Sequence, residues 1–106
     1  MVQPTTKETI MPYVHISHSP GRTLADYRAV LQAVGDEPAD GHLLSTAGEA
    51  DGALHTADLW DSKASADRFV AERLFPAFAK TGLGPGNDST YVEFETDQVS
   101  LGGDAR

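Results

Sequence analysis

The sequence contains no cysteine. Its absence excludes disulfide bonds, a thiolate nucleophile and zinc sites built from sulfur. The chain also has no apolar run near the ~20 residues that cross a bilayer. Its first residues, MVQPTTKETIMPYV, lack the charged start and apolar stretch of a secretory signal. We therefore expect a cytoplasmic protein that does not act in a membrane.

Basic residues are few and scattered. The chain has 8 Lys and Arg against 16 Asp and Glu, which gives a formal net charge of −8. Because a nucleic-acid surface needs a concentrated basic patch, nucleic acid is not the expected partner. The 4 histidines include no His-x-His pair, so the sequence also indicates no metal site. A chain of 106 residues with 40% hydrophobic residues is typical of one small globular domain.

The clearest predicted element is a helix in TLADYRAVLQAVG, from Thr23 to Gly35. Thr23 can cap its first turn, with Asp26 three residues on in a pattern like a capping box. Apolar residues then recur at helical spacing, and Gly35 can end the helix in the left-handed conformation. A second helix begins after Asp61 or Ser62 and runs to about residue 73 or 74. Pro76 then requires a kink or a short further helix.

Four segments alternate or are rich in β-branched and aromatic residues, as strands are. They are residues 13–18, 42–48, 53–60 and 90–96, with a hairpin at the EADG turn between the second and third. The order is therefore βαββαβ, which predicts an α+β, ferredoxin-like fold: a four-stranded antiparallel sheet with both helices on one face. We expect a flexible segment 1–10, a single domain 11–98 and a loose tail 99–106. Since one sheet face stays uncovered, we also expect a homodimer.

This arrangement resembles the dimeric α+β barrel superfamily, and within it the antibiotic-biosynthesis-monooxygenase-like proteins. The resemblance covers about residues 13–96 and rests on three segments: TLADYRAVLQAVG, GALHTADLWDS and ADRFVAERLFPAF. It implies two facing sheets that form a barrel, with an apolar pocket in each protomer between sheet and helices. The superfamily includes cofactor-free monooxygenases acting on aromatic polyketides, haem-degrading enzymes, cyclases and isomerases.

The resemblance carries over to one residue directly. A tryptophan that ends the third strand lines the pocket in the monooxygenase and haem-degrading branches, and Trp60 stands at that position. The Asn that those branches use early in the fold has no counterpart, because the only Asn is Asn87. Val70 stands where the haem-degrading branch places its histidine ligand, about ten residues after the tryptophan. No cofactor is therefore expected.

The candidate site residues follow from strand geometry. Thr56, Asp58 and Trp60 share one strand face because side chains alternate with a period of two. An aspartate beside an indole could act as a general acid or base, and Trp60 could stack on a flat ligand. His55 points to the other face. The alternatives are an Asp58 paired with Arg28 or Arg73 and a Trp60 that only packs.

Histidines of the first strand could supply an acid–base partner. We expect the first and third strands to be parallel neighbours, which would bring His15, Ser17 or His18 near the Thr56–Asp58–Trp60 row. His18 is favoured over His15 because it ends its strand, where a pocket mouth would lie. Tyr27 and Arg73 are candidate substrate contacts from the helices.

Two classes of function remain open. The first is a cofactor-independent enzyme on a small apolar or aromatic, polyketide-like molecule: a monooxygenase that deprotonates its substrate for direct reaction with oxygen, or a cyclase or isomerase that uses the same proton transfer without oxygen. The second is a dimer that binds a small molecule without catalysis. A pocket in which Asp58 and a histidine converge would favour an enzyme.

Overall fold

The computed structural model describes residues 11–100 and 102. The predicted flexible segment 1–10 and most of the predicted tail lie outside the described residues. The elements follow the predicted order: β1 (Tyr13–Pro20), α2 (Leu24–Val34), β2 (His42–Ala50), β3 (Ala53–Trp60), α3 (Lys63–Phe69), the π-helical segment η1 (Val70–Leu74), α4 (Phe75–Thr81) and β4 (Thr90–Glu95).

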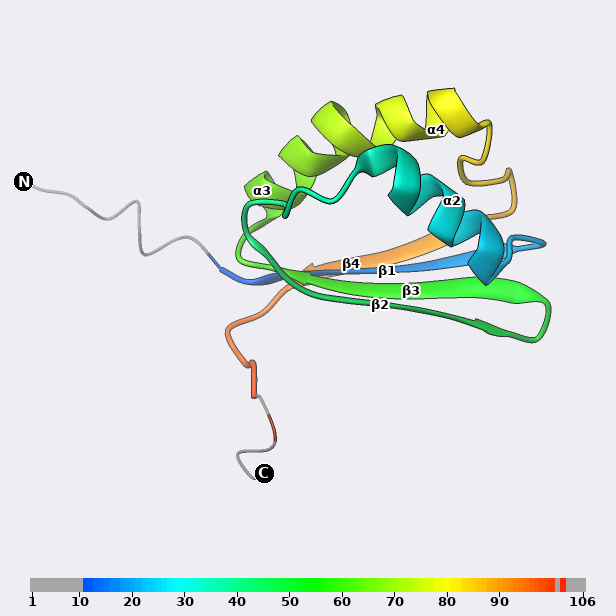
Figure 1. The fold of residues 1–106 in the computed structure, drawn as a ribbon. Coiled ribbons are helices and arrows are strands. Elements are labelled where there is room, and N and C mark those ends of the chain that lie inside the picture. Colours follow the sequence, from blue (N-terminus) through cyan, green and yellow to red (C-terminus); the bar gives the residue numbers. More distant parts are fainter. Residues whose placement is uncertain (1–10, 101, 103–106) are drawn as a thin grey trace, which may run out of the picture.

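The strands form one 4-stranded antiparallel sheet in the order β2-β3-β1-β4. Within the described residues all helices lie on one face of this sheet, and none lies on the opposite face (Figure 1). The predicted α+β, ferredoxin-like fold is therefore confirmed. The expectation that β1 and β3 are parallel was wrong, because they pair antiparallel. The crossover through α2 makes β2 parallel to β1, and the β2–β3 hairpin then reverses the chain.

The β2–β3 hairpin has a two-residue turn, and this turn sets the register of the sheet. Asp51 and Gly52 both have positive φ, at 54° and 76°, as the Asp-Gly pair of a type I′ turn requires. Ala50 then pairs with Ala53, and the register continues regularly up to the pair Leu44 and Leu59. Beyond it a β-bulge at Leu43 shifts the register, and His42 comes to lie opposite Trp60.

Helix α2 begins with the predicted capping box. The Thr23 hydroxyl accepts from the Asp26 amide at 3.1 Å, and the Asp26 carboxylate accepts from the Thr23 amide at 3.0 Å. The Glu49 carboxylate accepts from the Leu24 amide at 2.6 Å, so β2 also anchors this helix end. Gly35 ends the helix with a positive φ of 99°, but its ψ of 171° is not the left-handed helical value that we expected.

The second helical region is continuous in space but changes its hydrogen bonding along its length (Figure 1). Ser62, one of the two predicted caps, accepts from the Ser65 amide at 3.2 Å. The α-helix ends at Phe69, five residues of π-helix follow, and α4 starts with Pro76 in its first turn. The wider π-turn accommodates the missing proline amide, which agrees with the predicted interruption. Within residues 11–100 no helix has both the length and the apolar character needed to cross a membrane.

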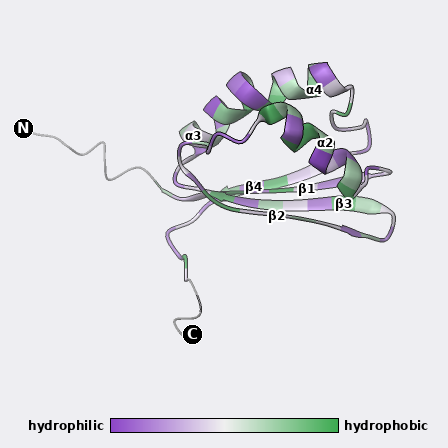
Figure 2. Cartoon of the chain, in the orientation of Figure 1, coloured by the Kyte–Doolittle hydropathy of each residue, from purple (hydrophilic) through white to green (hydrophobic). Residues whose placement is uncertain are grey.

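In the middle of the sheet the strands place mainly polar residues toward the helices and mainly apolar residues away from them. On β4, Tyr91 and Glu93 share the helix-facing side with Ser17 and His15 of β1, whereas Val92 and Phe94 pair with Ile16 and Val14 on the other side. The alternating pattern of β4 alone allows either of its sides to face the helices, and its pairing with β1 decides between them. Figure 2 shows hydrophobic and hydrophilic residues mixed along both layers.

The packed part of the interior is small. Tyr13, Trp60 and Ala66 form the buried cluster, with Ala39 and Phe69 against it. Among the described residues no large side chain is fully buried. The helices therefore close on the sheet at the end where β1 starts and β3 ends, and the rest of the interlayer space is free for a cavity.

Gly41 offers a direct test of the packing at that end. Its φ is +83°, and a Cβ there would lie 2.6 Å from the Ser65 hydroxyl oxygen and 2.7 Å from the Ser65 Cβ. We expect Gly41→Ala to lower the free energy of unfolding by more than about 1 kcal/mol, because it combines strain with a steric clash. Urea denaturation measures the change. Gly48→Ala is the matched control, since a Cβ at Gly48 meets nothing within 4 Å; an equal loss in both variants would contradict the prediction.

Candidate active site

A cavity of about 610 Å³ lies between the sheet and the helices. This volume is within the range of ~300–1,000 Å³ typical of small-molecule sites. Its two walls differ in chemistry. The helix wall is mainly apolar and includes Val30, Leu31, Phe69, Val70, Leu74, Phe75 and Phe78, with Asp26, Tyr27, Lys63 and Asp67 as its polar members. The sheet wall is largely polar and includes His15, Ser17, His42, Ser45, Thr56, Asp58, Tyr91 and Glu93. An amphipathic, flat molecule would match both walls.

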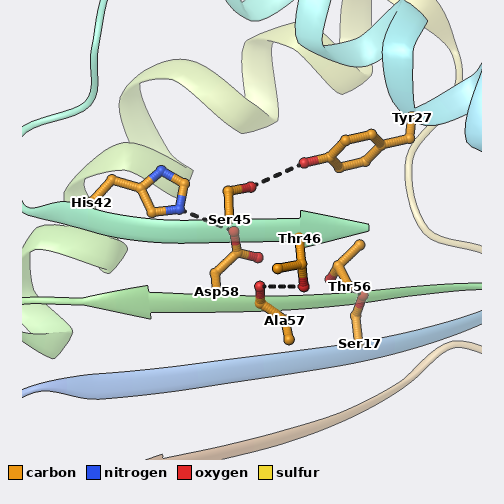
Figure 3. Close-up of polar contacts among 8 residues, drawn as sticks. All are labelled: Ser17, Tyr27, His42, Ser45, Thr46, Thr56, Ala57 and Asp58. Carbon is orange, nitrogen blue, oxygen red and sulfur yellow. Dashed lines mark hydrogen bonds and ion pairs between the residues drawn. The ribbon is translucent and has the colours of Figure 1, made fainter. Parts of the chain in front are cut away.

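At the closed end of the cavity, His42, Asp58 and Trp60 form one unit. His42 Nε2 lies 3.0 Å from Asp58 Oδ1, and Figure 3 shows the two side chains reaching toward each other from β2 and β3. The imidazole stacks on the Trp60 ring with centroids 4.0 Å apart and an angle of 5° between the planes. Both polar side chains remain about one-fifth exposed, at 23% and 21%. The pair is therefore oriented and still accessible.

This unit owes its geometry to the β-bulge at Leu43. With the regular register of the hairpin, Leu43 would lie opposite Trp60; the bulge places His42 there instead. Bulges redirect side chains in this way beside many active sites. The Gly41 carbonyl accepts from the Asp61 amide at 2.7 Å, which fixes the chain just before the bulge. The close approach of Gly41 to Ser65 thus helps to position His42.

Trp60 does not stand free in the cavity. Only 4% of it is exposed, because His42 covers one ring face and Phe69 lies 5.3 Å away at a tilt of 44°. It lines the cavity, as predicted for the Thr56–Asp58–Trp60 row. Its direct contact, however, is with His42 and Phe69. An indole packed in this way holds the imidazole in one plane.

Two hydroxyl pairs lie beside this unit. The Ser17 and Thr56 hydroxyls are 2.5 Å apart on neighbouring strands. The Tyr27 hydroxyl, from α2, lies 3.2 Å from the Ser45 hydroxyl (Figure 3). All four side chains line the cavity. Tyr27 and Thr56 are thus placed where a bound molecule could contact them, as the sequence led us to expect.

His15 is the candidate histidine that the fold brings to the cavity. It lies opposite Asp58 on one side and opposite Glu93 on the other. Its ring is 5.5 Å from the Tyr91 ring, measured between centroids. The predicted approach of β1 to the Thr56–Asp58–Trp60 row is therefore correct for His15 and Ser17, although the strands run antiparallel.

His18 and Arg73 lie elsewhere. His18 pairs with His55 on the sheet face away from the helices, with ring centroids 4.8 Å apart, so the expectation that it lies at the pocket mouth was wrong. Arg73 donates to the carbonyls of Glu37 at 2.7 Å and Pro38 at 3.3 Å. It fastens the loop after α2 and does not line the cavity that contains Asp58.

Tyr13 and Glu93 form a further polar pair that sequence reasoning missed. The Tyr13 hydroxyl donates to Glu93 Oε1 at 2.6 Å, and both residues line the cavity. Burial raises the pKa of the Tyr13 phenol, and the hydrogen bond to Glu93 and its negative charge raise it further. The phenol is therefore held in its neutral form, as a donor. The even spacing of Glu93 and Tyr91 was the available signal, but it did not show which face they take.

His42 was the other omission. It begins β2, an edge strand, and the sequence around it shows no partner at a short spacing. Its partners Asp58 and Trp60 are 16 and 18 positions away and meet it only through the bulged register. The available signal was the hairpin turn at Asp51 and Gly52. Counting cross-strand pairs of β2 and β3 outward from this turn brings the start of β2 beside the end of β3.

Comparison with known proteins identifies the fold. No protein-family model and no curated protein matches the chain. Among solved structures, Rv0793 from Mycobacterium tuberculosis is 18% identical with a TM-score of 0.63, and the match covers 84% of this chain and 99% of that one. A protein of Caulobacter crescentus described as a candidate antibiotic biosynthesis monooxygenase is 14% identical with a TM-score of 0.62, covering 86% and 92%.

A third similar structure contains a ligand. It is a monooxygenase from the gene ActVA-Orf6 of Streptomyces coelicolor in complex with nanaomycin D, 17% identical with a TM-score of 0.58, covering 93% of this chain and 99% of that one. The chain therefore has the fold of the antibiotic-biosynthesis-monooxygenase-like proteins. The resemblance drawn from the sequence is confirmed at the level of the fold.

The Tyr13 phenol makes the free energy of unfolding depend on pH in the alkaline range. Its pKa in the folded protein lies above the ordinary tyrosine value of 10.0, so above pH ~10 the unfolded chain releases a proton that the folded protein retains. The free energy of unfolding should therefore fall as the pH rises above 10. We expect Tyr13→Phe to lose less stability than the wild type between pH 9 and pH 11, as measured by urea denaturation. A pH dependence identical in both proteins would contradict this.

Proposed function

We propose that this protein is a small cofactor-independent enzyme that binds a flat aromatic molecule of polyketide type and removes a proton from it, acting as a monooxygenase. The observation that carries the proposal is the His42–Asp58 pair on the wall of a cavity with one apolar and one polar side. Its support from similar proteins is the shared fold and the nanaomycin D bound in one of them.

The pair has the arrangement of a general base with its orienting carboxylate. We assign the proton of the neutral imidazole to Nε2, because Asp58 accepts there at 3.0 Å. The lone pair then resides on Nδ1, on the side of the ring away from Asp58 (Figure 3). The charge of Asp58 stabilises the imidazolium that forms when Nδ1 takes a proton. Trp60, stacked on the imidazole, prevents the ring from turning.

The oxygen step follows from the deprotonation. The proton leaves on His42 and the electron pair of the broken bond stays on the ligand, whose fused rings delocalise it. An electron-rich carbanion of this kind can bond directly to dioxygen, and the resulting peroxide takes up the proton held by His42. Loss of water from this hydroperoxide then leaves one oxygen atom on the ligand as a carbonyl and releases the other as water. The apolar helix wall, with Leu31, Phe75 and Phe78, would exclude water from the ring that reacts.

A cyclase or isomerase is the second candidate. One observation favours it: the Asn that the monooxygenase branch uses early in its fold is absent, and Asn87 lies between α4 and β4 and does not line the cavity. The same base would then drive an aldol-type ring closure or a tautomer shift. Oxygen dependence separates the two reactions.

We further propose that the protein is a homodimer in which two sheets face each other. The face away from the helices carries large exposed apolar residues: Ile16 at 37%, Leu44 at 54%, Val92 at 57% and Phe94 at 45%. They come from three of the four strands and lie on one side of the sheet. A contiguous apolar patch of this kind is typical of an interface, and a second copy offers a patch of the same shape and chemistry.

The catalytic proposal is tested with a panel of polycyclic phenols, incubated with the protein in air and under nitrogen, with products followed by mass spectrometry. We expect turnover that requires oxygen and incorporates label from ¹⁸O₂. His42→Ala should lower kcat by about 100-fold or more, since general bases typically contribute that much, and Asp58→Asn should also lower it because the ring loses its orienting charge.

His18→Ala is the histidine control, because its ring lies on the opposite face of the sheet. Size-exclusion chromatography first checks that this variant has the same apparent mass as the wild type. If it does, its kcat should be close to that of the wild type. Turnover under nitrogen would contradict the proposed monooxygenase reaction and support the cyclase or isomerase reaction instead. Ligand binding without turnover would contradict both enzymatic proposals and support a dimer that binds a small molecule without catalysis.

The dimer is tested by placing a charge on the apolar face. Ile16→Glu and Val92→Glu should shift the molar mass in light scattering from two chains to one, since burying an unpaired carboxylate in an interface is costly. Lys80→Glu, on α4 away from that face, is the control and should remain dimeric. A wild-type protein that is monomeric at micromolar concentration would refute the dimer.

A further inference from the structure

One row of polar side chains crosses the whole sheet beneath the cavity. Ser45 lies opposite Asp58, Asp58 opposite His15, and His15 opposite Glu93. All four line the cavity. Adjacent strands are ~4.8 Å apart, so Asp58 and Glu93 are separated by the width of one intervening strand. The His42–Asp58 pair therefore occupies one side of the cavity floor, and Glu93 occupies the other.

The Glu93 carboxylate is held in place by one hydrogen bond and can accept further ones. Its Oε1 accepts from the Tyr13 hydroxyl at 2.6 Å, and Tyr13 is only 4% exposed, so the donor is fixed by the buried cluster. A carboxylate has about four lone-pair positions, of which this bond occupies one. β4 is an edge strand, and Glu93 is exposed and lines the cavity. Its carboxylate is therefore accessible to a ligand.

The charges around the cavity favour a ligand that donates hydrogen bonds. The carboxylates that line it are Asp26, Asp58, Asp67 and Glu93, and the lining cations are Arg22 and Lys63. Lys63 is paired with Asp67 at 3.1 Å, and the Arg22 guanidinium donates twice to the Gly84 carbonyl, at 3.0 and 2.7 Å. Lys63 is the cation nearest to this pair, since its ammonium lies 5.7 Å from the centroid of the Tyr13 ring. Because both lining cations already have partners, a ligand carboxylate would meet the Glu93 carboxylate without a free cation to offset the repulsion, whereas a hydroxyl would meet an acceptor.

We propose that Glu93 is a second ligand-binding residue that selects aromatic molecules bearing a neutral hydroxyl on the β1–β4 side of the cavity and rejects the corresponding carboxylates. The proposal rests on the proposed function, because it assumes that the cavity binds an aromatic ligand. The hydroxyl donates to the Glu93 carboxylate while the rings lie against the apolar helix wall, and the far edge of the ligand points to His42.

Three naphthalenes with the same ring skeleton test the selection by calorimetry at pH 7. They are 2-naphthol, which donates a hydrogen bond; 2-methoxynaphthalene, which does not; and 2-naphthoate, which is anionic. We expect the wild type to bind 2-naphthol more tightly than either by about fivefold or more, the worth of one hydrogen bond. Glu93→Gln should reduce the preference over 2-naphthoate by about fivefold. Its amide oxygen can still accept from Tyr13, so the variant should fold.

Glu95→Gln is the matched control. It removes the same charge from the same strand, two residues away, and Glu95 is absent from the cavity wall. Its preference ratios should equal those of the wild type. Equal shifts in both variants would show a general charge effect and overturn the proposal, as would a wild type that binds 2-naphthoate as tightly as 2-naphthol.

The outcomes also separate this proposal from the proposed function. Binding of all three naphthalenes without discrimination refutes the role of Glu93 and leaves the aromatic cavity intact. Failure to bind any of them refutes both. Selective binding that is lost in Glu93→Gln, together with no turnover of any phenol, supports the role of Glu93 and refutes the enzyme.

Discussion

In the middle of the sheet the alternation of polar and apolar residues is inverted relative to the usual two-layer α+β domain, and the cavity depends on this inversion. In most such domains the apolar side of the sheet packs on the helices. Here Ser17, Thr56 and Asp58 face the helices, whereas Ile16 and Val92 face away. A polar sheet surface gains little from contact with the apolar helix side chains, so the layers close tightly only around Tyr13 and Trp60. The remaining volume becomes a cavity with two chemically different walls.

Much of the fold could be predicted because its signals are local. The capping box at Thr23, the Asp51-Gly52 turn and the period-two pattern of β3 each specify their own segment. The strand order then follows from topology rules that do not depend on individual residues. Strand direction was misjudged for β1 and β3, although the same crossover and hairpin determine it. The face taken by β4 stayed open, because both of its sides carry bulky residues.

The site was predicted only in part, since it combines residues that a local pattern cannot connect. The Thr56–Asp58–Trp60 row lies on one strand, so periodicity found it. The partner of Asp58 is a residue of another strand, and a single inserted residue decides which one. Because a shift of one residue exchanges the two faces of a strand, the bulge at Leu43 determines that a histidine, and not a leucine, meets Trp60. No propensity or spacing in the sequence marks that bulge.

The same inversion links the cavity to the proposed dimer. Polar residues used on the helix-facing side leave the apolar residues of β1, β2 and β4 on the open side, where Leu44 and Val92 are more than half exposed. A protomer with this small packed cluster buries little apolar surface by itself, and burial is the main source of folding free energy. Covering the open face with a second sheet would supply that burial without filling the cavity. The proposed dimer is therefore the arrangement in which a chain of this size can keep an open cavity and still be stable.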